Sequence, residues 1–86
     1  MQPLIKPQIN LNGTSKEQLL QQQMIVMAGF RELLSAMSDA MPHGRDYQFR
    51  PSEYPLARDA WLERMKAIQA IEAEIFDHAM AISDET

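Results

Sequence analysis

The chain lacks cysteine altogether and has only three glycines among its 86 residues. Without cysteine, a disulfide framework, a thiolate nucleophile and a thiolate metal site are excluded, and a reducing compartment such as the cytoplasm is favoured. No stretch approaches the roughly 20 consecutive apolar residues that a membrane-spanning helix requires. The first seven residues show neither the basic start nor the unbroken apolar run of a secretory signal peptide. We therefore expect a cytoplasmic protein without a membrane partner.

Positive charge is scarce as well. The chain has 8 Lys and Arg residues against 12 Asp and Glu residues, which gives a net charge of −4. General nucleic-acid-binding proteins concentrate Lys and Arg, so this balance argues against that class. The acidic residues gather toward one end, because residues 59–86 carry seven of them and only two basic residues. This acidic part is a candidate surface for attracting a basic partner protein.

A first amphipathic helix is predicted over residues 15–41. Thr14 is its expected N-cap, because Glu17 follows three residues later in the spacing of a capping box. Pro42 and Gly44 should end the helix, since proline cannot continue it and glycine readily adopts the left-handed closing conformation. The apolar side chains cover roughly 200° of this helix, about twice the arc that one packed face requires.

A second helix is predicted over residues 55–82, after a polar loop at residues 42–54. Its apolar seam follows spacings of four and three residues and consists of Ala57, Trp61, Arg64, Ile68, Ile71, Ile75, His78 and Ile82. Two of these eight positions are polar, and we expect each to be a satisfied group that fixes the register of packing. Arg64 could pair with Glu32 or Asp39 of the first helix.

Residues 1–13 are expected to form an extended arm, because two prolines in the first seven residues oppose a helix and Asn12-Gly13 is a turn signal. Ile5, Ile9 and Leu11 would share one face of the arm and would need a surface to cover. Two antiparallel helices cannot surround a core. The chain should therefore be a single all-α domain, a helical hairpin that assembles into a homodimeric four-helix bundle or a larger homo-oligomer. The arm would then lie across a neighbouring chain.

The loop and the start of the second helix gather side chains that can bind a phosphate-bearing ligand. Arginine offers a planar fork for phosphate, tyrosine offers a ring face for stacking, and glycine lets a ligand approach the backbone. The predicted ligand-binding residues are His43, Gly44, Arg45, Asp46, Tyr47, Arg50 and Tyr54. The alternative is a purely structural loop, in which charged residues pair with neighbours, aromatic rings close the end of the bundle and Gly44 is only a helix cap.

Two short motifs resemble a group of small bacteriophage and prophage proteins that carry no assigned function. These motifs are Asn10-Leu11-Asn12-Gly13-Thr14-Ser15 and His43-Gly44-Arg45-Asp46-Tyr47, and the likeness covers about residues 9–82. The resemblance implies a phage accessory protein that acts in the bacterial host cytoplasm. In size and expected oligomerisation the chain is also similar to phage anti-defence sponges, which are small helical oligomers that sequester cyclic nucleotide signals of bacterial immunity.

These features predict a binding protein rather than an enzyme. There is no nucleophile with an identifiable base and no phosphate-binding glycine loop, and no cofactor is expected. A metal site at Glu74 and His78 is disfavoured, because two ligands without a third are a weak signal. The leading hypothesis is an anti-defence protein that sequesters a phosphate-bearing small molecule such as a cyclic nucleotide. The alternatives are an acidic helical module that inhibits or scaffolds a host or virion protein, and a purely structural assembly element.

Overall fold

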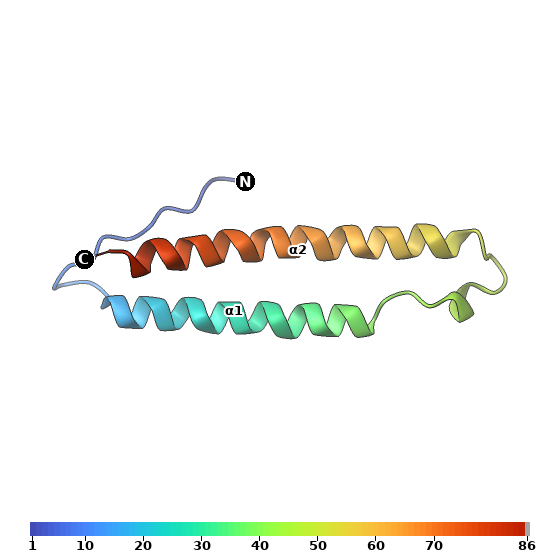
Figure 1. The fold of residues 1–86 in the computed structure, drawn as a ribbon, viewed down its shortest axis with the longest axis horizontal. Coiled ribbons are helices and arrows are strands. Elements are labelled where there is room, and N and C mark those ends of the chain that lie inside the picture. Colours follow the sequence, from blue (N-terminus) through green and yellow to red (C-terminus); the bar gives the residue numbers. More distant parts are fainter. Residues whose placement is uncertain (86) are drawn as a thin grey trace.

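The computed structural model describes residues 1–85 and shows two long helices packed side by side (Figure 1). Helix α1 spans Lys16–Asp39, a short 3-10 helix η1 spans Gly44–Tyr47, and helix α2 spans Glu53–Ser83. The two long helices run antiparallel, and the chain measures 63 × 22 × 16 Å along its principal axes. No strand is present in residues 1–85, so the expected all-α helical hairpin is confirmed.

The start of α1 differs by one residue from the prediction. Its N-cap is Ser15, whose side-chain oxygen accepts a hydrogen bond from the Gln18 backbone N–H at 3.2 Å. The Gln18 side chain accepts one from the Ser15 backbone N–H at 3.3 Å, which completes a capping box. The predicted box of Thr14 and Glu17 is therefore wrong. Both pairs have the required spacing, but serine caps a helix somewhat better than threonine, and glutamine can replace glutamate in the box.

The end of α1 also differs from the prediction, because the helix stops at Asp39 rather than at Met41. The Met41 backbone N–H donates to the Ser38 carbonyl at 3.3 Å, three residues back instead of four. Met41 precedes Pro42, and a residue before proline is driven away from the helical region. Gly44 does not close the helix in a left-handed conformation, since no residue in the described range has a positive φ. It begins η1 instead.

Contacts at both ends fasten the two helices to each other. Near the loop, the Trp61 indole N–H donates to the Met37 carbonyl at 2.8 Å. At the opposite end, Lys16 Nζ donates to the Glu85 carbonyl at 2.7 Å. Ile82, near that same end, is 1% exposed and is the only side chain in residues 1–85 that is buried. The hairpin therefore has a seam of contacts between its helices but almost no enclosed core.

The polar residues of the predicted α2 seam lie in different environments. Arg64 is exposed, and its Nη1 donates to the Ala60 carbonyl of the same helix at 3.2 Å. The suggested pairing of Arg64 with Glu32 or Asp39 is absent from the ion pairs within residues 1–85. His78 is partly buried.

The N-terminal segment, residues 1–9, has no regular secondary structure and runs beside the C-terminal part of α2 (Figure 1). Lys6 Nζ lies 3.0 Å from a carboxylate oxygen of Glu85, which holds the segment near the end of that helix. Ile5 and Leu11 are 86% and 103% exposed. These two side chains therefore cover no surface of their own chain.

Candidate functional site

The loop between the helices is folded around η1, and His43 is the N-cap of that short helix. The His43 Nδ1 atom accepts a hydrogen bond from the Arg45 backbone N–H at 3.2 Å. The His43 carbonyl accepts a second one from the Asp46 backbone N–H at 3.0 Å. Because one ring nitrogen of His43 holds the loop backbone, only its Nε2 atom is left to meet a ligand.

Two tyrosines form an aromatic pair at this end of the hairpin. The ring centroids of Tyr47 and Tyr54 are 6.0 Å apart, and the ring planes are tilted by 44°. Gly44 lies beside this pair, since a Cβ added to it would be 4.0 Å from the Tyr54 Cδ2 atom. Both tyrosines are partly exposed. A stacking ligand would therefore bind an outer ring face or separate the two rings.

The two arginines of the loop differ in their availability to an anion. Arg50 forms a two-point ion pair with Glu53, in which Nε lies 3.1 Å from Oε2 and Nη1 lies 3.4 Å from Oε1. A phosphate at Arg50 would have to displace this carboxylate. Arg45 is exposed and makes no ion pair within residues 1–85. Arg45 is therefore the better placed of the two to bind an anion.

The structure thus brings together only part of the predicted ligand site. Three of the seven predicted residues are close neighbours, namely Gly44, Tyr47 and Tyr54. The other four are exposed, namely His43, Arg45, Asp46 and Arg50. In a single chain, the loop is a surface of aromatic and charged groups in which the carboxylates balance the arginines.

A cavity of about 480 Å³ lies at the opposite end of the hairpin, between residues 1–6 and α2. Its α2 wall consists of Glu74, Asp77, His78 and Ala81. Among the described residues, no group of three or more side chains is arranged to hold a metal ion, so Glu74 and His78 have no third ligand. No sequence motif indicates this cavity, because it forms only where the N-terminal segment folds back on α2.

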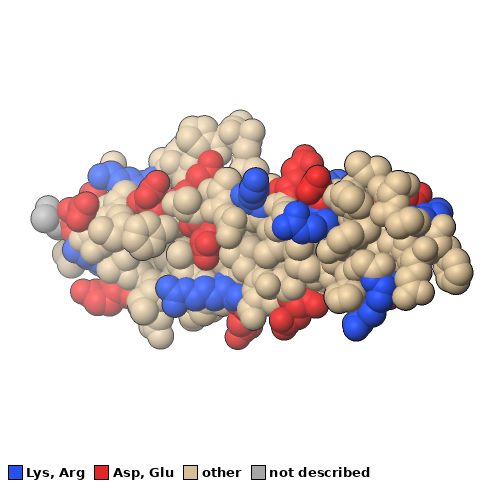
Figure 2. Space-filling view, turned by 45° about the vertical axis from the view of Figure 1, so that its right-hand side comes forward, with Lys and Arg blue, Asp and Glu red and all other residues tan. Residues whose placement is uncertain are grey.

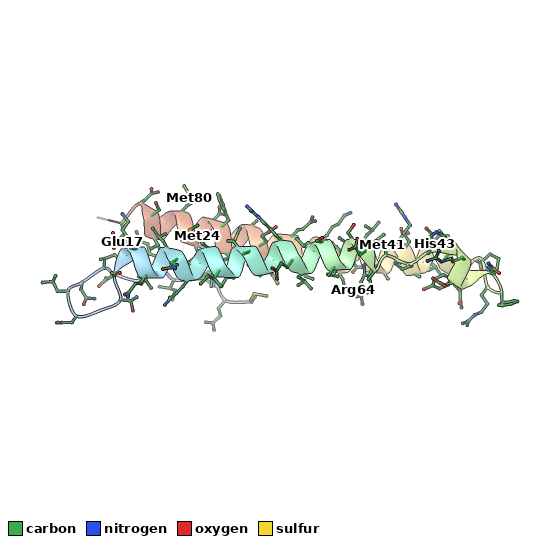
Figure 3. The ribbon with its side chains drawn as sticks, turned by 90° about the horizontal axis from the view of Figure 1, so that it is seen from below. Glu17, Met24, Met41, His43, Arg64 and Met80 are labelled. Carbon is green, nitrogen blue, oxygen red and sulfur yellow. The ribbon has the colours of Figure 1, made fainter. Side chains whose placement is uncertain are left out.

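Twelve large apolar side chains are exposed in residues 1–85. Met24 of α1 and Phe76 and Met80 of α2 are 70%, 52% and 48% exposed, and we call these three side chains the methionine patch. Figure 3 shows Met24 and Met80 toward one side of the hairpin, whereas Arg64 lies toward the other side. Methionine is flexible and polarisable, so such a patch can adapt to the shape of a partner.

Charged side chains of both signs are interspersed on the face shown in Figure 2, with broad uncharged areas between them.

Across residues 1–85, no helical stretch has both the length and the apolar character that a membrane crossing demands. No protein-family model matches the chain, and no curated protein and no solved structure matches it either. The two features of the chain that indicate a function are therefore the exposed apolar surface and, after it, the loop.

Proposed function

We propose that the protein is a helical interaction module that assembles with itself and binds a host or virion protein through the surface that remains free. The proposal rests on one observation: Ile82 is the only buried side chain in residues 1–85, whereas twelve large apolar side chains are exposed. Monomeric soluble proteins rarely expose contiguous apolar patches of more than a few hundred Å². Two helices packed on each other have no second layer to cover their outer faces, so another chain must supply it.

The simplest assembly is a homodimer in which two hairpins form a four-helix bundle. The N-terminal arm, residues 1–13, runs beside α2 of its own chain and adds to this interface by presenting its exposed apolar side chains to the neighbouring chain. The exposure of Ile5 and Leu11 in the single chain supports this placement. Burying a large aliphatic side chain contributes roughly 1.5–3 kcal/mol, so two such contacts per arm favour association substantially.

The acidic second half of the chain supplies recognition of a different protein. Residues 59–86 carry seven acidic and two basic side chains, and Glu74 and Asp77 among them are exposed. A basic surface, such as the nucleic-acid-binding face of a host protein, is attracted by these charges during encounter. By occupying that face in the bacterial cytoplasm, a phage accessory protein would inhibit the host protein.

Sedimentation velocity over a range of concentrations tests the self-assembly. The chain has a mass of 9.9 kDa, and a dimer sediments as a species of twice that mass. We expect the dimer or a discrete higher oligomer to dominate at micromolar concentration and to dissociate on dilution. A helical monomer that persists at the highest soluble concentration overturns the proposal.

Neutralising the acidic residues of α2 tests the binding of a basic partner. We expect the E72Q/E74Q/D77N variant to bind a basic host protein more weakly than the unmodified chain and with less dependence on salt. The matched control neutralises the three acidic residues of α1 and keeps the same total charge. Equal effects of the two variants would show that net charge alone matters and that α2 is not the recognition surface.

A second candidate function is sequestration of a phosphate-bearing small molecule such as a cyclic nucleotide. It is favoured by the loop, where the paired rings of Tyr47 and Tyr54 offer faces for stacking and Arg45 makes no ion pair within residues 1–85. Native mass spectrometry of gently purified protein would detect nucleotide-sized extra mass on the oligomer. In calorimetric titrations with cyclic dinucleotides, R45A should abolish binding and R58A, which changes an arginine outside the loop, should not. Unaltered binding by R45A refutes this pocket.

A further inference from the structure

We infer that a second copy of this chain docks on one particular face of α1. This face, which we call the α1 seam, consists of Gln22, Val26, Gly29, Leu33, Ala36 and Ala40. The inference rests on the proposed self-assembly and goes further by naming the contact surface, the occupant and its direction. It also separates the self-contact from the methionine patch, which lies on the other face of the hairpin.

The α1 seam has the spacing of a helix–helix contact. Its residues follow one another at alternating intervals of four and three, so they form one nearly straight line along the helix. All six are exposed, with Val26 and Leu33 at 42% and 46%. None of the six is charged. The contact with α2 uses a different line of α1 that includes Phe30 and Leu34, so α1 presents two helix-packing faces and its own chain covers only one.

Gly29 indicates that a helix approaches this second face closely. Glycine in the interior of a helix is destabilising relative to alanine. A Cβ added at Gly29 would meet nothing within 4 Å in the single chain, so packing inside the chain does not require a glycine there. A helix from another chain accounts for it, because small residues at a contact let two helix axes approach toward the short end of the usual 8–10 Å range.

The α1 seam is complementary to itself in the antiparallel direction. A two-fold axis beside Arg31 places Gly29 opposite Leu33 of the second copy and Val26 opposite Ala36 of that copy. The outermost positions, Gln22 and Ala40, are paired in the same way. In every pair a small residue faces a larger one, which is the condition for interdigitated packing. A two-fold interface requires this self-complementarity, and a different protein partner would not.

The α1 seam supplies about half of the area that a stable dimer needs, and the adjoining face of α2 must supply the rest. Helix α1 has 24 residues and is therefore about 36 Å long. A helix with its side chains is about 10–12 Å wide, so the face of α1 alone offers roughly 400 Å². A standard protein interface buries about 800 Å² on each partner. The seam also carries no charge that would repel its own copy across the two-fold axis.

Substitutions on the two faces of the hairpin test which face makes the dimer. We expect L33E to raise the dimer dissociation constant at least a hundredfold, measured by sedimentation equilibrium, because it places two like charges in a dry contact. We expect the matched control F76E, on the methionine patch, to leave the dissociation constant within about threefold. G29A is the second variant, and it guards against misfolding because alanine favours the helix. It should still weaken the dimer about tenfold.

Disulfide crosslinking tests the antiparallel register. The chain has no cysteine of its own. The double variant V26C/A36C should form disulfide-linked dimers on oxidation, because the register places these positions opposite each other. A36C alone should not, since its counterpart in the second copy lies ten residues away along the seam, or about 15 Å. Rapid crosslinking by A36C alone, or none by the double variant, overturns the register.

The results separate this inference from the proposed function. An unmodified chain that stays monomeric refutes both. A dimeric chain that L33E and G29A leave intact, and that F76E dissociates, refutes the α1 seam while self-assembly stands. If L33E and G29A dissociate the dimer and F76E leaves its dissociation constant unchanged, the α1 seam is supported.

Discussion

Within residues 1–85, one side-chain hydrogen bond joins the loop ends of the two helices, and replacing Trp61 with phenylalanine should remove it. The last four carbonyls of a helix have no partner inside that helix. The Met37 carbonyl belongs to this last turn of α1, and the indole N–H of Trp61 donates to it at 2.8 Å. Trp61 therefore caps α1 from across the hairpin, and phenylalanine keeps an aromatic ring there but has no donor.

The expected loss follows from the environment of this bond. A typical hydrogen bond contributes about 1 kcal/mol net to stability, and an unpartnered group costs more only where water cannot reach it. The Trp61 bond is part-buried, so water can partly replace the indole. We therefore expect Trp61→Phe to lower the free energy of unfolding by about 1–2 kcal/mol per chain. For a chain of this size, each 1 kcal/mol lowers the Tm by about 4–8 °C.

Urea unfolding followed by circular dichroism measures this change, with all variants at one protein concentration. The matched control is Tyr54→Phe, which also removes one donor from an aromatic ring. The Tyr54 hydroxyl makes no hydrogen bond within the described residues, so this variant should change stability by less than about 0.5 kcal/mol. If Trp61→Phe were as stable as Tyr54→Phe, the indole would not cap α1, and its hydrogen bond to the Met37 carbonyl would not stabilise the hairpin.

Three further measurements test the packing, the cap and the assembly. Ile82→Ala should cost about 2–4 kcal/mol in urea unfolding, because Ile82 is the only buried side chain in residues 1–85, whereas Leu56→Ala at a 69% exposed position should cost less than about 0.5 kcal/mol. Ser15→Ala should cost about 1 kcal/mol and Thr14→Ala much less, and the reverse order would restore Thr14 as the cap. The Tm of a dimer should rise by about 4 °C for each tenfold increase in concentration, and a constant Tm would mean a monomer.

The fold was predictable where it depends on local spacing. Apolar residues at intervals of three and four predict helices without any knowledge of their partners, and both long helices are confirmed. The helix ends were less predictable, because Thr14 and Ser15 both satisfy the rule for an N-cap and only the packed chain selects between them. The assembly into an oligomer stays a prediction, which the sedimentation experiment tests.

The contacts across the hairpin were not predictable from the sequence. Trp61 and Met37 are 24 positions apart, and Lys16 and Glu85 are 69 positions apart. Which residues meet depends on the register between the helices, and no local pattern specifies that register. The candidate site shows the same limit, since residue types predicted a phosphate-binding loop but not the engagement of Arg50 by a carboxylate of its own chain.

The placement of the two apolar surfaces on opposite faces has a consequence for how binding and assembly are coupled. If the α1 seam around Leu33 holds the dimer, a protein bound at the methionine patch around Phe76 does not compete for the same surface. The dimer dissociation constant should then be nearly the same with and without that protein, and by linkage the affinity for that protein should not depend on dimerisation. A partner that instead converts dimers to monomers must compete for the α1 seam. Measuring the dissociation constant at saturating partner therefore distinguishes a module with two separate faces from one in which assembly and recognition exclude each other.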